Sequence, residues 1–342
     1  MIASVYSPRK KVIDDLLKIV FPFLWSGRTE LVTRSVVMLP KGKGGLGLEN
    51  PLYKMKALLI RPFLPILRRD DNSSCNFMFS RYFVAKKLRI LYPFLWTNSV
   101  PHSDTASDSY TVICASILHI GGKDVNFSTK AKKLRDIVLL LNPPREVPRI
   151  QQKFLMWDWS LIWKCIQDPL LCNKLKSFSW RLVQGALVTR AKLARWGVRN
   201  GQCPFCSKLE DIPHLFWHCK SIYGILCWVN KITDSIVGHS INFQFSTFVY
   251  SYPIPVISKK VWSRIWFLYV LVNHALWKRR CTFTFENRMT PDDVFMSNVK
   301  NEFRRRLLVD FKRWSREKFK KIWVEGSSIV TMEDAGPTLH IA

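Results

Sequence analysis

The sequence is poor in negative charge. It contains 25 Asp and Glu residues against 53 Lys and Arg residues, a formal net charge of +28 at pH 7. Such an excess of one sign opposes compaction unless a polyanion or an anionic surface neutralises it. Lysines and arginines that contact phosphates release counterions, which makes nucleic acid the natural polyanion. We therefore expect RNA and/or DNA as the partner of this chain, and no small-molecule substrate.

Long hydrophobic runs and a disulfide pattern are also missing. The most apolar stretch, residues 265–277, is too short to span a bilayer and contains Asn273 and His274. We predict a buried helix there and no membrane partner. The N-terminus lacks an uninterrupted apolar core followed by small residues, so we expect no secretory signal. The nine cysteines are odd in number and scattered, which favours a reducing compartment, the nucleus and/or the cytoplasm.

Three of the cysteines stand in a compact pattern with a histidine. Cys203, Cys206, His214 and Cys219 follow the spacing C-x2-C-x7-H-x4-C. Thiolate sulfur and imidazole nitrogen are the usual ligands of tetrahedral zinc, and one tight turn can direct two cysteines two residues apart at one ion. Residues five positions apart lie about 140° apart around an α-helix. We therefore predict a helix between His214 and Cys219 that ends or deforms near Cys219.

A second histidine offers another ligand set, in which His218 replaces Cys219. The two-cysteine, two-histidine finger has about twelve residues between its pairs, whereas this chain has seven between Cys206 and His214. Cys219 is therefore the better fourth ligand. A set of four protein ligands leaves no open coordination position. We expect a structural Zn²⁺ that stabilises the fold and activates no water.

Helical spacing dominates the remainder of the chain. A helix is expected over residues 9–25, interrupted at Pro22, and the pattern is helical from 155 to 200, with Gly197 as a C-cap, and again after Cys219. The glycine-rich run at residues 42–47 lacks the Gly-Lys-Ser/Thr ending of a phosphate-binding loop, so a flexible turn is expected. Residues 239–257 are interpreted as a loop or short strands. The interval from Pro143 to Pro148 is the preferred domain boundary.

The last long element is the clearest helix. Thr290 suits its N-cap, Pro291 its first position, and an apolar stripe that includes Phe303, Leu307 and Trp314 continues as far as residue 323. Basic residues occupy much of its remaining surface. Such runs are commonly solvated faces, but the net charge of the chain favours phosphate contacts. The candidate nucleic-acid-binding residues are Arg304, Arg305, Arg306, Lys312, Arg313, Arg316 and, in an earlier basic run, Lys130, Lys132 and Lys133.

Two blocks of the sequence resemble LINE-type (non-LTR) retrotransposon reverse transcriptases. The first contains Phe-Leu-Trp-x-Gly-Arg from Phe23, Leu-Pro-Lys-x-x-Gly-Gly-Leu-Gly-Leu from Leu39, and Lys-Ala-Leu-Leu from Lys56. It looks like the segment just downstream of the polymerase palm. The second joins a tryptophan-rich stretch, with Trp163 and Trp180, to the cysteine–histidine pattern. It resembles the zinc-binding region near the C-terminus of those polyproteins.

The resemblance and the helical pattern together predict a mainly α protein, with helical bundle segments and one small CCHC zinc knuckle. Five parts are expected: a thumb-like helical remnant at 1–68, a basic connector at 69–150, a reverse-transcriptase zinc-binding domain at 151–238, a C-terminal basic helical region at 239–325, and a loose tail at 326–342.

The polymerase metal site of that family is missing. Its palm carries an aromatic-x-Asp-Asp turn that holds metal ions, and none of the Asp-Asp pairs here, at residues 14–15, 70–71 and 292–293, follows that signature. We therefore expect a chain without polymerase activity that binds RNA or target DNA, beside a polymerase-containing protein supplied in trans. Two alternatives stay open at this point: a zinc-stabilised protein-interaction module, and a decayed retrotransposon relic without a selected function.

Overall fold

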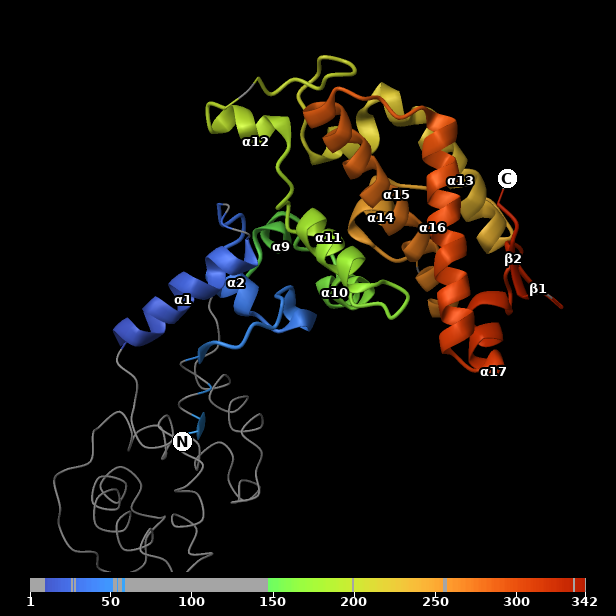
Figure 1. Cartoon of the computed structure of the whole chain (residues 1–342), viewed down its shortest axis with the longest axis horizontal. Helices are drawn as coiled ribbons and strands as arrows, with labels where there is room; N and C mark the ends of the chain where they lie inside the picture. Colours follow the sequence, from blue (N-terminus) through green and yellow to red (C-terminus); the bar gives the residue numbers. More distant parts are fainter. Residues whose placement is uncertain are drawn as a thin grey trace, which may run out of the picture. The chain divides into compact units, whose positions relative to one another are not determined.

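Figure 1 shows a computed structural model, which describes residues 10–25, 27, 29–51, 54, 57–58, 147–198, 200–254, 257–334 and 336–341. The chain divides into two compact units, one of Met1–Pro40 with Gly45–Val147 and one of Lys41–Gly44 with Pro148–Ala342. The change from the first unit to the second at Val147 and Pro148 lies in the interval where the sequence predicts a boundary. The expected connector and its Asp70–Asp71 pair lie outside the described residues.

In the first unit, α1 spans Lys10–Leu24 and α2 spans Arg34–Met38. Helix α1 runs through Pro22, so the expected interruption at that residue is wrong. Pro22 lacks the N–H that would bond to the carbonyl four residues earlier, and the helix nevertheless continues, with the Trp25 N–H donating to the Phe21 carbonyl at 3.0 Å.

The second unit is mainly helical, and the expected mainly α class is confirmed. Its elements are the 3₁₀ turn Lys41–Lys43, α9 (Arg149–Lys153), α10 (Trp159–Ile166), α11 (Asn173–Val183), α12 (Arg190–Arg195), the π-helix His214–His218, the 3₁₀ turn Lys220–Ile222, α13 (Tyr223–Val237), α14 (Phe245–Tyr250), α15 (Lys259–Glu286), α16 (Asp292–Arg313), α17 (Arg316–Phe319), the π-helix Lys320–Val324, β1 (Val330–Glu333) and β2 (Gly336–Leu339).

Helix α15 forms the centre of the second unit. All residues from Arg264 to Asn273 are buried, which confirms the buried helix predicted at 265–277. Helices α11, α13, α14 and α16 pack against it (Figure 1). Phe267 of α15 meets Phe303 of α16 and Trp323 edge-on, with ring centroids 5.1 and 5.7 Å apart. No helix in the described part of the chain is long and apolar enough to cross a membrane.

The expected helix near the C-terminus is two helices. Helix α16 ends at Arg313, Trp314 is extended, and the Ser315 side chain caps α17 by accepting from the Lys318 N–H. Pro291, and not Thr290, occupies the N-cap position of α16. The break lets the chain turn back, so that Phe319 and Trp323 become buried instead of extending the stripe outward.

Two regions expected to be irregular are ordered. Helix α14 lies within 239–257 and begins with a reciprocal capping box between Gln244 and Thr247, a signal that uses side chains other than the usual Ser and Glu. The tail contains an antiparallel hairpin in which Val330 pairs with Leu339. Both of these residues are buried, so the hairpin is held by packing of its apolar ends.

The glycine-rich turn is fixed on the second unit. The Gly44 carbonyl accepts hydrogen bonds from Trp180 Nε1 at 2.8 Å and Gln184 Nε2 at 2.6 Å. Gly44 has φ +89°, and a Cβ there would lie 2.7 Å from the Trp163 ring. Only glycine meets both demands without strain. The expected turn is present, and it is a packing element of α10 and α11.

Candidate metal centre

A short hairpin directs the first two cysteines at one point. Gln202 and Leu209 form an isolated antiparallel bridge. Inside it, the Cys203 N–H donates to the Lys208 carbonyl at 2.6 Å and the Ser207 N–H donates to the Cys203 carbonyl at 2.9 Å. Ser207 closes the turn with φ +58°, a left-handed conformation that is uncommon for a residue other than glycine. The closed turn brings the Cys203 and Cys206 sulfurs to the same side.

A π-helical turn supplies the other two side chains. Asp211 Oδ1 accepts from the His214 N–H at 2.8 Å and so begins this turn. The Cys219 N–H then donates to the His214 carbonyl at 2.9 Å. An i→i+5 hydrogen bond closes one turn around residues five apart, so His214 and Cys219 come onto one face, which an α-helix would prevent. The predicted deformation near Cys219 is confirmed.

The four side chains meet with the spacing that zinc requires. Cys203 Sγ lies 3.8 Å from Cys219 Sγ, and Cys206 Sγ lies 4.0 Å from Cys219 Sγ and 3.2 Å from His214 Nε2. All four ligand atoms lie within 4.8 Å of one another. Tetrahedral zinc with Zn–S bonds of about 2.3 Å puts its sulfur ligands about 3.8 Å apart. The residues therefore fit one Zn²⁺ in a closed, structural coordination sphere.

The alternative fourth ligand lies elsewhere. His218 is exposed, and its ring faces Phe245 at a centroid distance of 6.5 Å. Cys219 follows the π-helix as an extended residue, and its sulfur enters the cluster, whereas His218 does not.

Even without a metal ion, the surroundings of Cys219 favour its ionised thiolate form. The contact with Cys203 lowers the pKa of Cys219 to about 4. Burial opposes this shift, and the hydrogen bond with the Ser221 hydroxyl adds to it. The contact between the two cysteines, together with burial, raises the pKa of the Cys203 thiol. The two opposite shifts have one cause, the contact between these two sulfurs. Zinc would hold both as thiolates, because metal binding requires deprotonated cysteines.

A buried ion pair joins the zinc knuckle, residues 202–219, to α15. Glu210 Oε1 accepts from Arg280 Nη2 at 2.6 Å and Nε at 3.0 Å, and also from the Arg190 N–H at 2.9 Å. The Glu210 side chain is fully buried and that of Arg280 is 3% exposed. One carboxylate therefore ties the hairpin, the start of α12 and α15 together. The sequence analysis missed this pair, because 70 residues separate its members.

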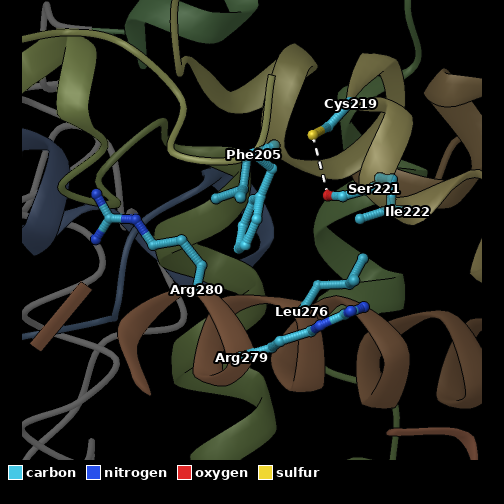
Figure 2. A pocket seen from close by; sticks show the side chains of 8 residues that line it. Phe205, Cys219, Ser221, Ile222, Leu276, Arg279 and Arg280 are labelled. Atoms are coloured by element: carbon cyan, nitrogen blue, oxygen red, sulfur yellow. Dashed lines mark hydrogen bonds between the residues drawn. The ribbon is translucent and has the colours of Figure 1, made fainter. Parts of the chain in front are cut away.

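A small cavity lies between the knuckle and α15 (Figure 2). It is lined by Phe205, Leu215, Cys219, Ser221, Ile222, Leu276, Arg279 and Arg280 and measures about 10 Å³. Ser221 Oγ lies 3.1 Å from Cys219 Sγ at its edge. This volume accommodates about one water molecule. The cavity is too small for a substrate, which agrees with a structural role for the metal.

The comparisons with known proteins point to the same region. Residues 147–225 match the protein-family model described as zinc-binding in reverse transcriptase. The resemblance to the C-terminal zinc-binding region of a retrotransposon reverse transcriptase is confirmed. A 94-residue segment is 30% identical to the transposon TX1 uncharacterized 149 kDa protein of Xenopus laevis. That segment is 28% of this chain and 7% of the relative, so the chain matches only a small part of that protein.

The nucleic-acid-binding candidates fall into three groups. Arg304, Arg305, Lys312, Arg313 and Arg316 are exposed, although Arg305 pairs with Glu302. Arg306 is different, because its side chain is 18% exposed and donates to Asp310 Oδ2 at 2.9 Å and to the Pro169 carbonyl at 3.2 Å. Lys130, Lys132 and Lys133 lie outside the described residues.

Asp310 explains why Arg306 is withdrawn from the surface. Its carboxylate is buried, accepts from Trp323 Nε1 at 3.1 Å, and has a pKa raised by burial. A buried carboxylate needs a countercharge, and Arg306, one helical turn earlier, supplies it. Arg306 therefore has a structural role in pairing with Asp310, and its contact with a nucleic acid stays a prediction.

Proposed function

We propose that this chain binds nucleic acid through backbone phosphates and that its zinc knuckle stabilises the scaffold without taking part in chemistry. The observation that carries the proposal is the two-faced character of α16. Phe295, Val299, Phe303 and Leu307 are buried along one side, while Arg304 and Lys312 lie exposed on the other. Phosphate contacts fix the register of a protein on nucleic acid without reading its sequence, and exposed cations on a rigid helix suit that role.

The proposal includes the absence of a polymerase step. A closed Cys₃His set holds its ion by four protein ligands and leaves no position for a water or a nucleotide. Two of the three Asp-Asp pairs lie in the described part of the chain, and one aspartate of each pair forms a salt bridge. Asp15 pairs with Lys18 on α1, and Asp292 pairs with Arg279 at 2.8 Å. A polymerase that uses this binding region would therefore contribute its own metal-binding carboxylates.

A salt series tests the proposal. The variant Arg304→Ala plus Lys312→Ala plus Arg313→Ala avoids Arg306 and so leaves the Asp310 pair intact. Removing one phosphate-binding cation lowers the slope of log K against log salt by about 0.9 on duplex and about 0.7 on single strands. We expect the slope to fall by about 2.7 and about 2.1 if all three residues bind phosphates.

The matched control removes three exposed lysines from other surfaces, Lys220→Ala plus Lys231→Ala plus Lys259→Ala. Both variants reduce the net charge from +28 to +25. Equal slopes in the two variants would mean that α16 acts only through overall charge. A wild-type protein that binds neither RNA nor DNA at low salt would overturn the proposed function.

A protein partner is the second candidate, and one observation favours it. Leu308 and Val309, on the outer face of α16, are 49% and 48% exposed. Exposed apolar side chains beside cations also suit a protein interface. The variant Leu308→Ser plus Val309→Ser separates the two functions, since it would weaken binding to a polymerase-containing protein while leaving the salt slope for nucleic acid unchanged.

A further inference from the structure

The loop between α9 and α10 exposes two large apolar side chains. Leu155 is 81% exposed and Met156 is 94% exposed. Both stand at the centre of a β-turn, which the Trp157 N–H closes by donating to the Phe154 carbonyl at 3.2 Å. The centre of a turn usually carries Gly, Pro, Asn, Asp or Ser. Leucine and methionine neither favour this turn nor become buried by it, so their chemistry points to a partner outside the fold.

The turn is supported by aromatic rings. The rings of Phe154 and Trp157, at its two ends, stack with centroids 4.4 Å apart and 12° between their planes. Trp157 also lies 5.2 Å from the Tyr252 ring. The Phe154 carbonyl accepts from Nε1 of the buried Trp159 at 3.0 Å. These contacts fix both ends of the turn, so its two apolar side chains project from a rigid support. Residues 154–157 are called the apolar tip.

Exposed cations lead up to the apolar tip, and none of them forms an ion pair with a described residue. Arg149 and Lys153 stand one turn apart on the same side of α9, which ends directly before the tip. At the other end of α9 lies the turn Lys41–Lys43, since a Cβ on Gly44 would lie 3.0 Å from Pro148 Cγ. Both lysines of that turn are exposed, as are the two cations of α9.

Negative charge is missing along this path. No acidic residue stands between Pro148 and Trp157. The next one, Asp158, directs Oδ1 to the start of α10 and accepts from the Ser160 N–H at 3.0 Å. Four cations beside an apolar tip match a partner that carries phosphates on its outside and stacked rings within. A nucleic-acid duplex has this arrangement, and it is the partner that the charge favours.

We propose that the apolar tip is a wedge, with Leu155 and Met156 inserting between two stacked base pairs of duplex nucleic acid. Arg149, Lys153 and the Lys41–Lys43 turn bind the phosphates beside that step. The inference rests on the proposed function and adds to it a deformation of the bound duplex. Inserted apolar side chains, Leu and Met among them, unstack a base step and kink the duplex by about 20–90°. Because the tip is already rigid, inserting it orders few additional groups.

A labelled duplex tests the wedge directly. Pyrimidine–purine steps such as TA are the easiest to unstack, so the duplex is rich in G·C pairs and has one central TA step. The adenine of that step is replaced by 2-aminopurine, whose fluorescence is quenched by stacking, and the two ends carry a donor and an acceptor dye. We expect wild-type protein to raise both the 2-aminopurine fluorescence and the energy transfer between the ends.

The decisive variant is Leu155→Ser plus Met156→Ser, which keeps the net charge and places turn-compatible residues at the tip. Both signals should be lost in this variant. Leu155→Met plus Met156→Leu exchanges the two side chains, keeps the tip apolar, and should retain both signals. Leu308→Ser plus Val309→Ser is the matched control on α16, where the side chains are 49% and 48% exposed, and it should also behave as wild type.

A salt series separates the wedge from the phosphate contacts. The serine variant of the tip removes no cation, so its slope of log K against log salt should equal that of wild type. Arg149→Ala plus Lys153→Ala should lower the slope on duplex by about 1.8 if both residues bind phosphates. Its control is Lys220→Ala plus Lys231→Ala, which has the same net charge. Zinc content and the denaturant midpoint of each variant show that it is folded.

The outcomes distinguish the wedge from the proposed function. Wild-type protein that binds no nucleic acid overturns both. Duplex that is bound but stays stacked and straight, or a serine variant that keeps both signals, overturns the wedge and leaves the proposed function standing. Copies of the chain that associate through the tip, seen as a smaller species for the serine variant in size-exclusion chromatography with unchanged fluorescence, overturn it as well. Loss of both signals confined to the folded serine variant establishes the wedge.

Discussion

Breaking the Glu210–Arg280 pair tests how the zinc knuckle is held on the scaffold. Replacing Glu210 by Ala leaves a guanidinium that is 3% exposed without its countercharge. It also removes the acceptor of the Arg190 N–H at the start of α12. Removing one partner of a buried ion pair costs about 3–5 kcal/mol. We expect Glu210→Ala and Arg280→Ala each to lower the free energy of unfolding by about that amount.

The double variant shows whether the loss of stability arises from the charge left unpaired in each single variant. With both charges gone, no unpaired charge is buried, so Glu210→Ala plus Arg280→Ala should cost clearly less than the sum of the single changes. Glu210→Gln is the conservative control, because its amide oxygen can still accept from the Arg190 N–H and from one Arg280 N–H. It should cost less than Glu210→Ala.

Denaturant unfolding in excess zinc measures these changes, and zinc content is determined on each purified variant. Zinc should remain bound at one ion per chain, since all four ligands lie between residues 203 and 219. Single variants that each unfold within about 0.5 kcal/mol of wild type, the range of neutral surface changes, would refute the reasoning. Strictly additive single and double variants would show that the two side chains stabilise the fold independently.

The remaining predictions concern metal, catalysis and pH. Cys203→Ser plus Cys206→Ser should lose zinc and a large part of the stability, whereas His218→Ala should keep the metal, as measured by metal analysis of purified protein; the reverse result would make His218 the ligand. Primer extension by this chain with magnesium should stay undetectable on any template, and products from the purified protein would contradict the proposal. The pKa of His274 is lowered from 6.5 to about 4, so the unfolded state binds the proton more readily and stability should fall as pH falls from 6.5 to 4. His274→Gln should fall less over that range, and identical pH profiles would show that this histidine does not titrate as described.

The zinc ligands are the part of this protein that sequence alone predicts best. Their identities and spacing are local, and the chemistry of zinc restricts the ligands to a few residue types. The same locality explains why deformation near Cys219 could be expected, since two ligands five residues apart do not share one face of an α-helix. The buried helix at 265–277 was predictable for a similar reason, because a continuous run of apolar residues favours burial whatever the remainder of the fold.

Features that depend on packing were not predictable. The sequence shows a stripe continuing from α16 past Trp314, but burial of Phe319 and Trp323 turns the chain back at Trp314. Arg306 looks like its basic neighbours, yet it pairs with Asp310, which Trp323 also contacts, and so lies against the fold. The tail forms a hairpin because Val330 and Leu339 find an apolar surface.

The sequence by itself determined the metal, its four ligands, the mainly helical class and the strong positive charge. Tertiary structure alone decided that Glu210 meets Arg280 across 70 residues, that Gly44 is anchored to α11, and that Asp310 meets Trp323. The physical reason is the range of the interactions. Ligand spacing and helical periodicity are set by neighbours along the chain, whereas a countercharge from another helix is supplied only once distant helices have packed together.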